Sequence, residues 1–84
     1  MRERPADDEL RAVGLNQSFG LWLRQVRQHK RMSLDVVAEK SGLTKPSVWA
    51  IERGASVPSL TTATRISNAL GVPLSKVLAW MEQE

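Results

Sequence analysis

Residues 33–54 read SLDVVAEKSGLTKPSVWAIERG, and this stretch decides the fold. Ser33 and Thr44 each precede a short segment with apolar residues at helical spacing, and a hydroxyl group in that position caps the N-terminus of a helix. Gly42 stands between the two segments, where a sharp turn needs a residue that tolerates a positive φ. Pro46 fits the first turn of the second segment, because the N–H that proline lacks has no partner there. The stretch therefore predicts two short helices joined by a tight turn.

The apolar residues of this stretch are spaced as in a helix-turn-helix, in which two helices pack closely across a turn. Ala38 supplies the small residue that a close approach of the helices requires. Thr44 opens the second helix with a hydroxyl group and free backbone N–H groups, which suit a phosphate. The side chains expected to point into the shared core are Val37, Leu43, Val48 and Ile51.

Three further helices are predicted on either side of this unit. The first is expected to begin after Ser18 and to run to about Lys30, whereas the fourth begins after Ser59 and ends at Gly71, and the fifth follows Pro73. Their apolar stripes comprise Phe19, Trp22, Leu23 and Val26, then Leu60, Ala63, Ile66, Ala69 and Leu70, then Leu74, Val77, Leu78 and Met81, with Trp80 at the edge. The predicted fold class is therefore all-α, a compact domain of five helices.

The domain is predicted to cover residues 17–84, with an N-terminal tail over residues 1–16. Pro5, followed by the acidic run Asp7-Asp8-Glu9, suits the first turn of a short helix. Two interpretations remain open for this tail: it is loosely attached, or it forms a helix that docks on the domain or on a second subunit.

Composition excludes several classes of protein. The chain has no Cys and one His, so disulfides, a thiol nucleophile and a zinc site of the common Cys/His type are not expected. No nucleophile–base pair can be assembled, so we expect neither an enzyme nor a cofactor or metal site. No apolar run approaches the length of about 18 residues that a membrane span requires, and the charged start lacks the apolar core of a secretory signal. A cytoplasmic protein is expected.

Positive charge is concentrated in the middle of the chain. Residues 17–56 contain seven Lys and Arg against three Asp and Glu, whereas residues 1–16 and 57–84 are close to neutral. This basic middle part coincides with the predicted helix-turn-helix and indicates a polyanionic partner.

A wider set of residues shows a known pattern. The matching positions are Phe19-Gly20, Leu23, Arg27, Ser33, Val37-Ala38, Gly42, Thr44, Val48, Ile51-Glu52-Arg53-Gly54, Pro58-Ser59-Leu60 and Ala69-Leu70-Gly71-Val72. With them, residues 19–78 resemble the Cro/repressor-type helix-turn-helix domain of the xenobiotic-response-element-like family of regulators. The resemblance implies a lambda-repressor-like domain of a prokaryotic or phage regulator, usually a homodimer, whose third helix (about residues 44–53) enters the major groove of double-stranded DNA.

The resemblance also implies roles for individual residues. Arg27 and Glu52 match a pair that forms a structural salt bridge between the first and third helices. Ser33, Thr44 and Arg53 match positions that meet the DNA backbone; Arg31, next to Ser33, is either a further contact or a solvated side chain. The positions of the base-reading face are Lys45, Pro46, Ser47, Trp49 and Ala50.

The outer edge of the fifth helix is the candidate homodimer interface. Leu74, Val77 and Trp80 are placed there, because large apolar side chains at a helix edge are common interface anchors. Trp22 and Trp80 are expected to be core or dimer residues. Trp49 is equally suited to a partly buried packing position or to a binding surface.

Two departures from the family pattern concern the DNA-facing surface. Leu34 stands where the family commonly has a Gln that contacts the DNA backbone. The reading face offers Pro46, Trp49 and Ala50 in place of polar side chains, so Lys45 and Ser47 are the clear hydrogen-bonding candidates. Readout is therefore expected to be partly apolar or shape-based.

Two functions follow from these observations. The first is a small sequence-specific transcriptional regulator, such as a phage repressor or a restriction–modification controller, that binds a two-fold operator as a homodimer. The alternative is an antitoxin-like or other interaction module, in which the same fold holds a partner protein such as a toxin or an anti-repressor.

Overall fold

The computed structural model describes residues 19–83, all of whose regular elements are helices. A first helix covers residues 19–29 (helix 19–29), and it is followed by α2 (Leu34–Ser41), α3 (Lys45–Glu52), α4 (Leu60–Ala69) and α5 (Leu74–Glu82). The all-α fold class is confirmed. The predictions for the tail over residues 1–16 and for Ser18 as a helix cap lie outside the described residues.

Three of the predicted helix caps are present. The side chain of Ser33 accepts a hydrogen bond from Val36 N at 3.1 Å, and that of Thr44 accepts one from Ser47 N at 3.2 Å. Ser59 does the same for α4 with Thr62 N, at 3.1 Å. Each cap satisfies an N–H that the helix itself leaves unpaired, which is worth about 1 kcal/mol.

The turn between α2 and α3 has the predicted geometry. Gly42 has a φ of 72°, in the left-handed region, which a residue with a side chain adopts only at a cost. The backbone N–H of Leu43 donates to Ala38 O at 2.8 Å, which closes the end of α2. The chain therefore reverses within Gly42, Leu43 and Thr44, and α3 begins at once.

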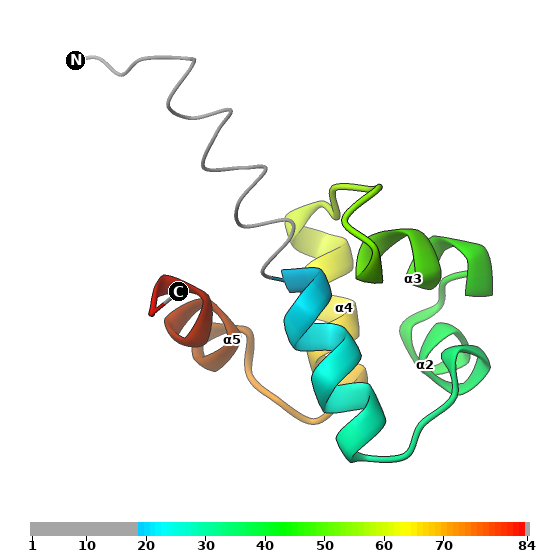
Figure 1. Cartoon of the computed structure of the whole chain (residues 1–84), viewed down its shortest axis with the longest axis horizontal. Helices are drawn as coiled ribbons and strands as arrows, with labels where there is room; N and C mark the ends of the chain where they lie inside the picture. Colours follow the sequence, from blue (N-terminus) through cyan, green and yellow to red (C-terminus); the bar gives the residue numbers. More distant parts are fainter. Residues whose placement is uncertain (1–18, 84) are drawn as a thin grey trace.

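The core is formed where all five described helices meet. Figure 1 shows α4 behind helix 19–29, with α5 on one side and α2 and α3 on the other. Val37, Val48 and Ile51 are buried and Leu43 packs partly against them, as predicted for the helix-turn-helix. The rest of the buried cluster consists of Phe19, Trp22, Leu23, Ala38, Ile66, Leu70, Val77 and Met81.

Gly20 allows helix 19–29 to lie directly against the end of α3. A Cβ atom at this position would overlap the carbonyl oxygen of Ile51 and lie 3.0 Å from that of Glu52. Backbone atoms cannot rotate away as a flexible side chain can, so the glycine is required by this helix contact.

The dimer-interface prediction for Val77 is wrong, and two residues of the predicted apolar stripes, Leu78 and Leu60, are exposed. Val77, expected at a dimer interface, is 0% exposed and belongs to the core, because α5 turns Val77 and Met81 toward the other helices. Leu78, one residue further around α5, is 41% exposed. Leu60 is 72% exposed; it is the first residue of α4 and stands at the end of the stripe. Helical spacing predicts a stripe but not how far the neighbouring helices extend over it.

None of the described helices has the length and apolar character to cross a membrane.

Candidate nucleic-acid interface

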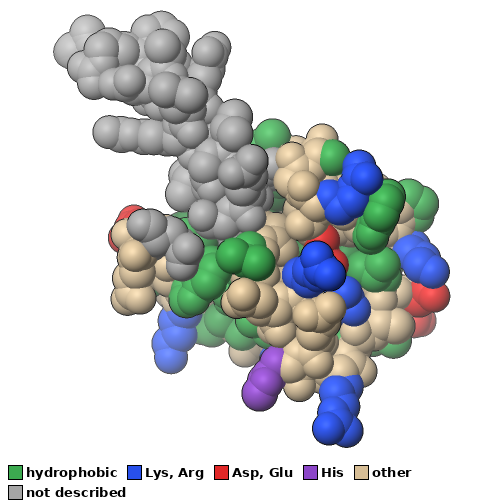
Figure 2. Space-filling view, viewed as in Figure 1, with side chains coloured by type: hydrophobic (Ala, Val, Ile, Leu, Met, Phe, Trp, Pro, Cys, Tyr) green, Lys and Arg blue, Asp and Glu red, His purple; other side chains and the backbone are tan. Residues whose placement is uncertain are grey.

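The residues expected at DNA lie along the outer side of α3 and at the start of α2. The exposed residues of α3 are Lys45, Pro46, Ser47 and Trp49. The cap residues Ser33 and Thr44, which precede α2 and α3, are also exposed, as is Arg53 just after α3. Ala50 is half-buried. Figure 2 shows Lys and Arg side chains spread over the face formed by helix 19–29 and α3, with few carboxylates among them. The structure therefore brings this set together on one basic surface.

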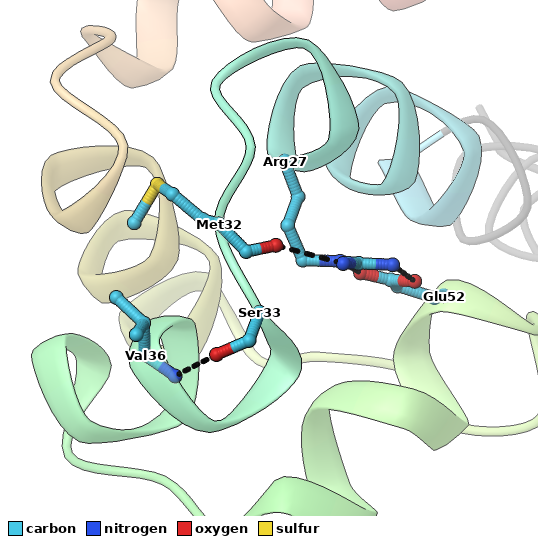
Figure 3. Close-up of polar contacts among 5 residues, drawn as sticks. All are labelled: Arg27, Met32, Ser33, Val36 and Glu52. Atoms are coloured by element: carbon cyan, nitrogen blue, oxygen red, sulfur yellow. Dashed lines mark hydrogen bonds and ion pairs between the residues drawn. The ribbon is translucent and has the colours of Figure 1, made fainter.

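Arg27 and Glu52 form the ion pair expected from the family pattern (Figure 3). Arg27 Nε donates to Glu52 Oε2 at 2.6 Å, and its NH2 group donates to Oε1 at 3.2 Å. This bidentate geometry is the strong form of an arginine–carboxylate contact. The side chains are 14% and 4% exposed, respectively, so both charges are largely removed from water.

Arg27 also reaches the segment before α2. Its NH1 group donates to Met32 O at 2.9 Å, one residue before the Ser33 cap (Figure 3). One guanidinium group thus connects helix 19–29, the entry to α2 and the end of α3. The pair positions the two helices of the helix-turn-helix and has little capacity left for a ligand.

Arg31 is held in an unusual backbone conformation. Its φ is 57°, in the left-handed region where a residue with a side chain costs about 1–2 kcal/mol. Hydrogen bonds from Arg31 N to Gln28 O at 3.0 Å and from Met32 N to Arg27 O at 2.9 Å close the end of the helix around it. The exposed Arg31 side chain is therefore carried on a defined turn, two residues before Ser33.

Arg53 stacks on Trp49, a contact that our sequence analysis missed. The guanidinium carbon of Arg53 lies 4.1 Å from the centroid of the Trp49 ring, well within the range of a cation–π contact. Trp49 remains 49% exposed, so it is a surface residue. The spacing of four residues along one helix was the signal that predicts such a contact.

Asp35 lies beside the reading face and was also missed. Its Oδ2 atom is 3.8 Å from Lys45 Nζ, and both side chains are well exposed. A pair of this kind contributes about 0–1 kcal/mol. Its consequence is local, because the Asp35 carboxylate offsets part of the positive charge that Lys45 brings to this surface.

The hydroxyl groups at the start of α3 are ordered relative to each other. Thr44 Oγ1 donates to Ser47 Oγ at 2.8 Å while it accepts from Ser47 N. Ser47 Oγ is the acceptor in this bond, so its own proton remains available to a hydrogen-bond acceptor outside the protein.

These structural features agree with a comparison of the sequence with known protein families. A model of the Cro/C1-type helix-turn-helix family matches residues 23–77. The chain belongs to this family of DNA-binding regulators. The match covers α2, α3, α4 and most of helix 19–29, and so includes the whole of the surface described above.

Curated relatives of this helix-turn-helix protein are regulators. The HTH-type transcriptional regulator SutR of Escherichia coli is 37% identical over 57 residues, which cover 68% of this chain and 32% of SutR. The uncharacterised HTH-type transcriptional regulator YgzD of Bacillus subtilis is 34% identical over 62 residues, which cover 74% of this chain and 92% of YgzD. The chain spans about a third of the length of SutR and about half of that of YqaE, an uncharacterised HTH-type transcriptional regulator of B. subtilis.

Solved structures of regulators share the fold. The clp gene regulator ClgR of Corynebacterium glutamicum superposes with a TM-score of 0.77 at 28% identity, covering 82% of this chain and 73% of ClgR. The restriction–modification controller protein C.Esp1396I, crystallised as a tetramer with its natural 35-base-pair operator, gives a TM-score of 0.75 at 20% identity, covering 82% of this chain and 91% of the controller. The latter likeness concerns the fold alone.

Proposed function

We propose that this helix-turn-helix protein is a sequence-specific transcriptional regulator that places α3 in the major groove of a two-fold DNA operator. The observation that carries the proposal is the division of α3 into two sides. Val48 and Ile51 are buried against the domain, whereas Lys45, Ser47 and Trp49 are exposed. A major groove admits a helix with this exposed side, and its base edges offer acceptors to such donors.

Within this proposal the residues divide into backbone and base contacts. Arg31, Ser33, Thr44 and Arg53 are assigned to phosphates. Lys45 donates to guanine O6 and N7, and Ser47 donates or accepts at a base edge. Pro46 and Ala50 contact thymine methyl groups, and the Arg53-stacked indole of Trp49 packs on sugars or base edges. With few hydrogen bonds to bases, part of the specificity comes from DNA shape.

DNA binding is tested by the response to salt. The unchanged protein should bind a random-sequence duplex with an affinity that falls steeply between low and physiological salt, since phosphate contacts release counterions. Lys45→Ala and Arg53→Ala should each weaken binding about tenfold, as measured by fluorescence anisotropy. Lys76→Ala, which removes one exposed charge on α5, is the matched control and should have little effect. Absence of binding by the unchanged protein even at low salt would contradict the proposal.

The homodimer is proposed to form through the outer edge of α5. With Val77 assigned to the core, the residues that remain for this interface are the half-buried Leu74 and Trp80 and the exposed Leu78. Half-sites would then lie about one helical turn of DNA apart.

Analytical sedimentation tests the proposed α5 homodimer. At high micromolar concentration the unchanged chain should sediment as a dimer, and Leu78→Ser should shift it toward the monomer, since the substitution removes apolar area from the contact. Leu60→Ser changes a more exposed leucine outside α5 and should leave the dimer intact. A monomeric unchanged chain, or dissociation by Leu60→Ser alone, would contradict an α5 interface.

A protein-interaction module is the second candidate, and the exposure of Trp49 favours it. Tryptophan is enriched at the energetic centres of protein interfaces, and here it stands near Pro46 on the surface proposed to meet DNA. A toxin or anti-repressor held by this face would leave DNA binding weak and insensitive to Lys45→Ala. The salt titration therefore also separates the two candidates, both of which place the protein in the cytoplasm.

A further inference from the structure

A cleft of about 290 Å³ lies beside the proposed reading face. Helix 19–29 contributes Arg24 to its lining, α2 contributes Leu34, and α3 and its C-terminal end contribute Trp49 and Arg53. The Arg27–Glu52 pair also lines it. The cleft thus joins three elements that the helix-turn-helix scaffold holds in place.

The net charge of this cleft comes from two arginines. Glu52 receives a hydrogen bond from Arg27 on each of its carboxylate oxygens, so this pair is internally neutral. Within residues 19–83, neither Arg24 nor Arg53 forms an ion pair with a carboxylate. Two positive charges are therefore left to face whatever enters the cleft.

The stacking of Arg53 leaves its hydrogen-bonding edge available. The guanidinium carbon lies 4.1 Å from the centroid of the Trp49 ring, and no carboxylate within residues 19–83 pairs with the N–H groups of Arg53. The stack restricts the side chain, so less conformational entropy is lost when the N–H groups bind an oxygen. Trp49 and Leu34 add apolar walls of low dielectric to the cleft, and such walls strengthen the attraction between the arginines and an anion.

We propose that this cleft receives a phosphate of the DNA backbone, held between Arg24 and Arg53. Paired guanidinium groups match the oxygens of a phosphate in charge and geometry. Leu34 offers no side-chain donor there, so the polar contacts come from the arginines. The inference rests on the proposed function and adds Arg24, on helix 19–29, as a backbone contact of the same surface.

The test compares two arginine substitutions of equal charge. Arg24→Gln removes a cation from the cleft, whereas Arg65→Gln removes one from α4, where Arg65 lines a separate hollow next to Gly42. Both side chains are exposed, so the fold should be unaffected, which thermal unfolding monitors. Binding to a random-sequence duplex is measured by anisotropy at a series of salt concentrations.

Arg24→Gln should weaken binding about tenfold and reduce the slope of log K against log salt by about one, since one phosphate contact is lost. Arg65→Gln should leave the slope unchanged. Equal slopes for the two variants, with the unchanged protein still binding DNA, would overturn the cleft assignment alone. No DNA binding by the unchanged protein would overturn it together with the proposed function.

A second measurement distinguishes a DNA phosphate from a free anion. The side-chain Nε–H signals of Arg24 and Arg53 are followed by NMR during titration with duplex DNA and, separately, with inorganic phosphate. Both signals should shift with the duplex at concentrations at which inorganic phosphate has no effect. Shifts produced by inorganic phosphate and not by DNA would overturn the proposal, because the cleft would then be a site for a small anion.

Discussion

Replacing Glu52 with alanine is expected to lower the free energy of unfolding by about 3–5 kcal/mol, because Arg27 would be left as an uncompensated charge in a largely buried position. Arg27 is 14% exposed, and within residues 19–83 its one acceptor besides Glu52 is Met32 O. Small domains have a free energy of unfolding of about 5–15 kcal/mol. The expected loss is a large part of this total, so a fraction of the Glu52→Ala molecules should be unfolded even without denaturant.

Chemical denaturation of the unchanged protein and the variant measures this loss. Asp35→Ala breaks the exposed Lys45–Asp35 pair and is the matched control, with an expected change of less than about 1 kcal/mol. The double variant Arg27→Met, Glu52→Leu should recover most of the stability, because apolar side chains need no ionic partner. If Glu52→Ala and Asp35→Ala lowered the free energy of unfolding by similar amounts, the burial of the Arg27–Glu52 pair would not add to the stability, contrary to the prediction.

Gly20→Ala is expected to destabilise the domain although it places a better helix former within a helix. Intrinsic helix propensity alone favours alanine by about 1 kcal/mol. The added Cβ would instead overlap Ile51 O and press on Glu52 O, and relieving such overpacking costs about 1–3 kcal/mol or more. The net expectation is a lower melting temperature and, because the end of α3 must move, weaker DNA binding.

Thermal unfolding and the anisotropy assay test this prediction together. Gln25→Ala, at an exposed position of the same helix, is the matched control and should change the stability by no more than about 0.5 kcal/mol. A Gly20→Ala variant that melts at a higher temperature than the unchanged protein would mean that helix 19–29 does not pack this closely on α3.

The local features of the fold were predictable from the sequence because their causes are local. Ser33, Thr44 and Ser59 cap the helices that follow them, since a side-chain oxygen needs only an N–H three residues later. Gly42 ends α2 in the left-handed conformation, which glycine adopts readily because it has no Cβ atom. The ion pair of Arg27 with Glu52 was inferred from family resemblance, since nothing local links residues so far apart in the chain.

The surface of the candidate site was predicted less completely. Lys45, Ser47 and Trp49 are exposed as the helical pattern suggests, but the stacking of Arg53 on Trp49 and the position of Asp35 beside Lys45 were not anticipated. The Arg53–Trp49 contact joins residues four apart in the chain, a spacing that can be read from the sequence. The Lys45–Asp35 contact depends on the angle between α2 and α3, which the spacing of residues along a single helix does not reveal.

The sequence by itself determined that residues 33–54 fold as two capped helices around a glycine turn, because caps, turns and helical periodicity act over three or four residues. Only the tertiary structure decided which side chains are buried and which residues from different helices come together. Val77 is core and Leu78 is exposed, Gly20 is required by a backbone carbonyl of α3, and Arg24 shares a cleft with Arg53. These outcomes depend on the relative placement of whole helices, which is set by the packing of the entire core at once.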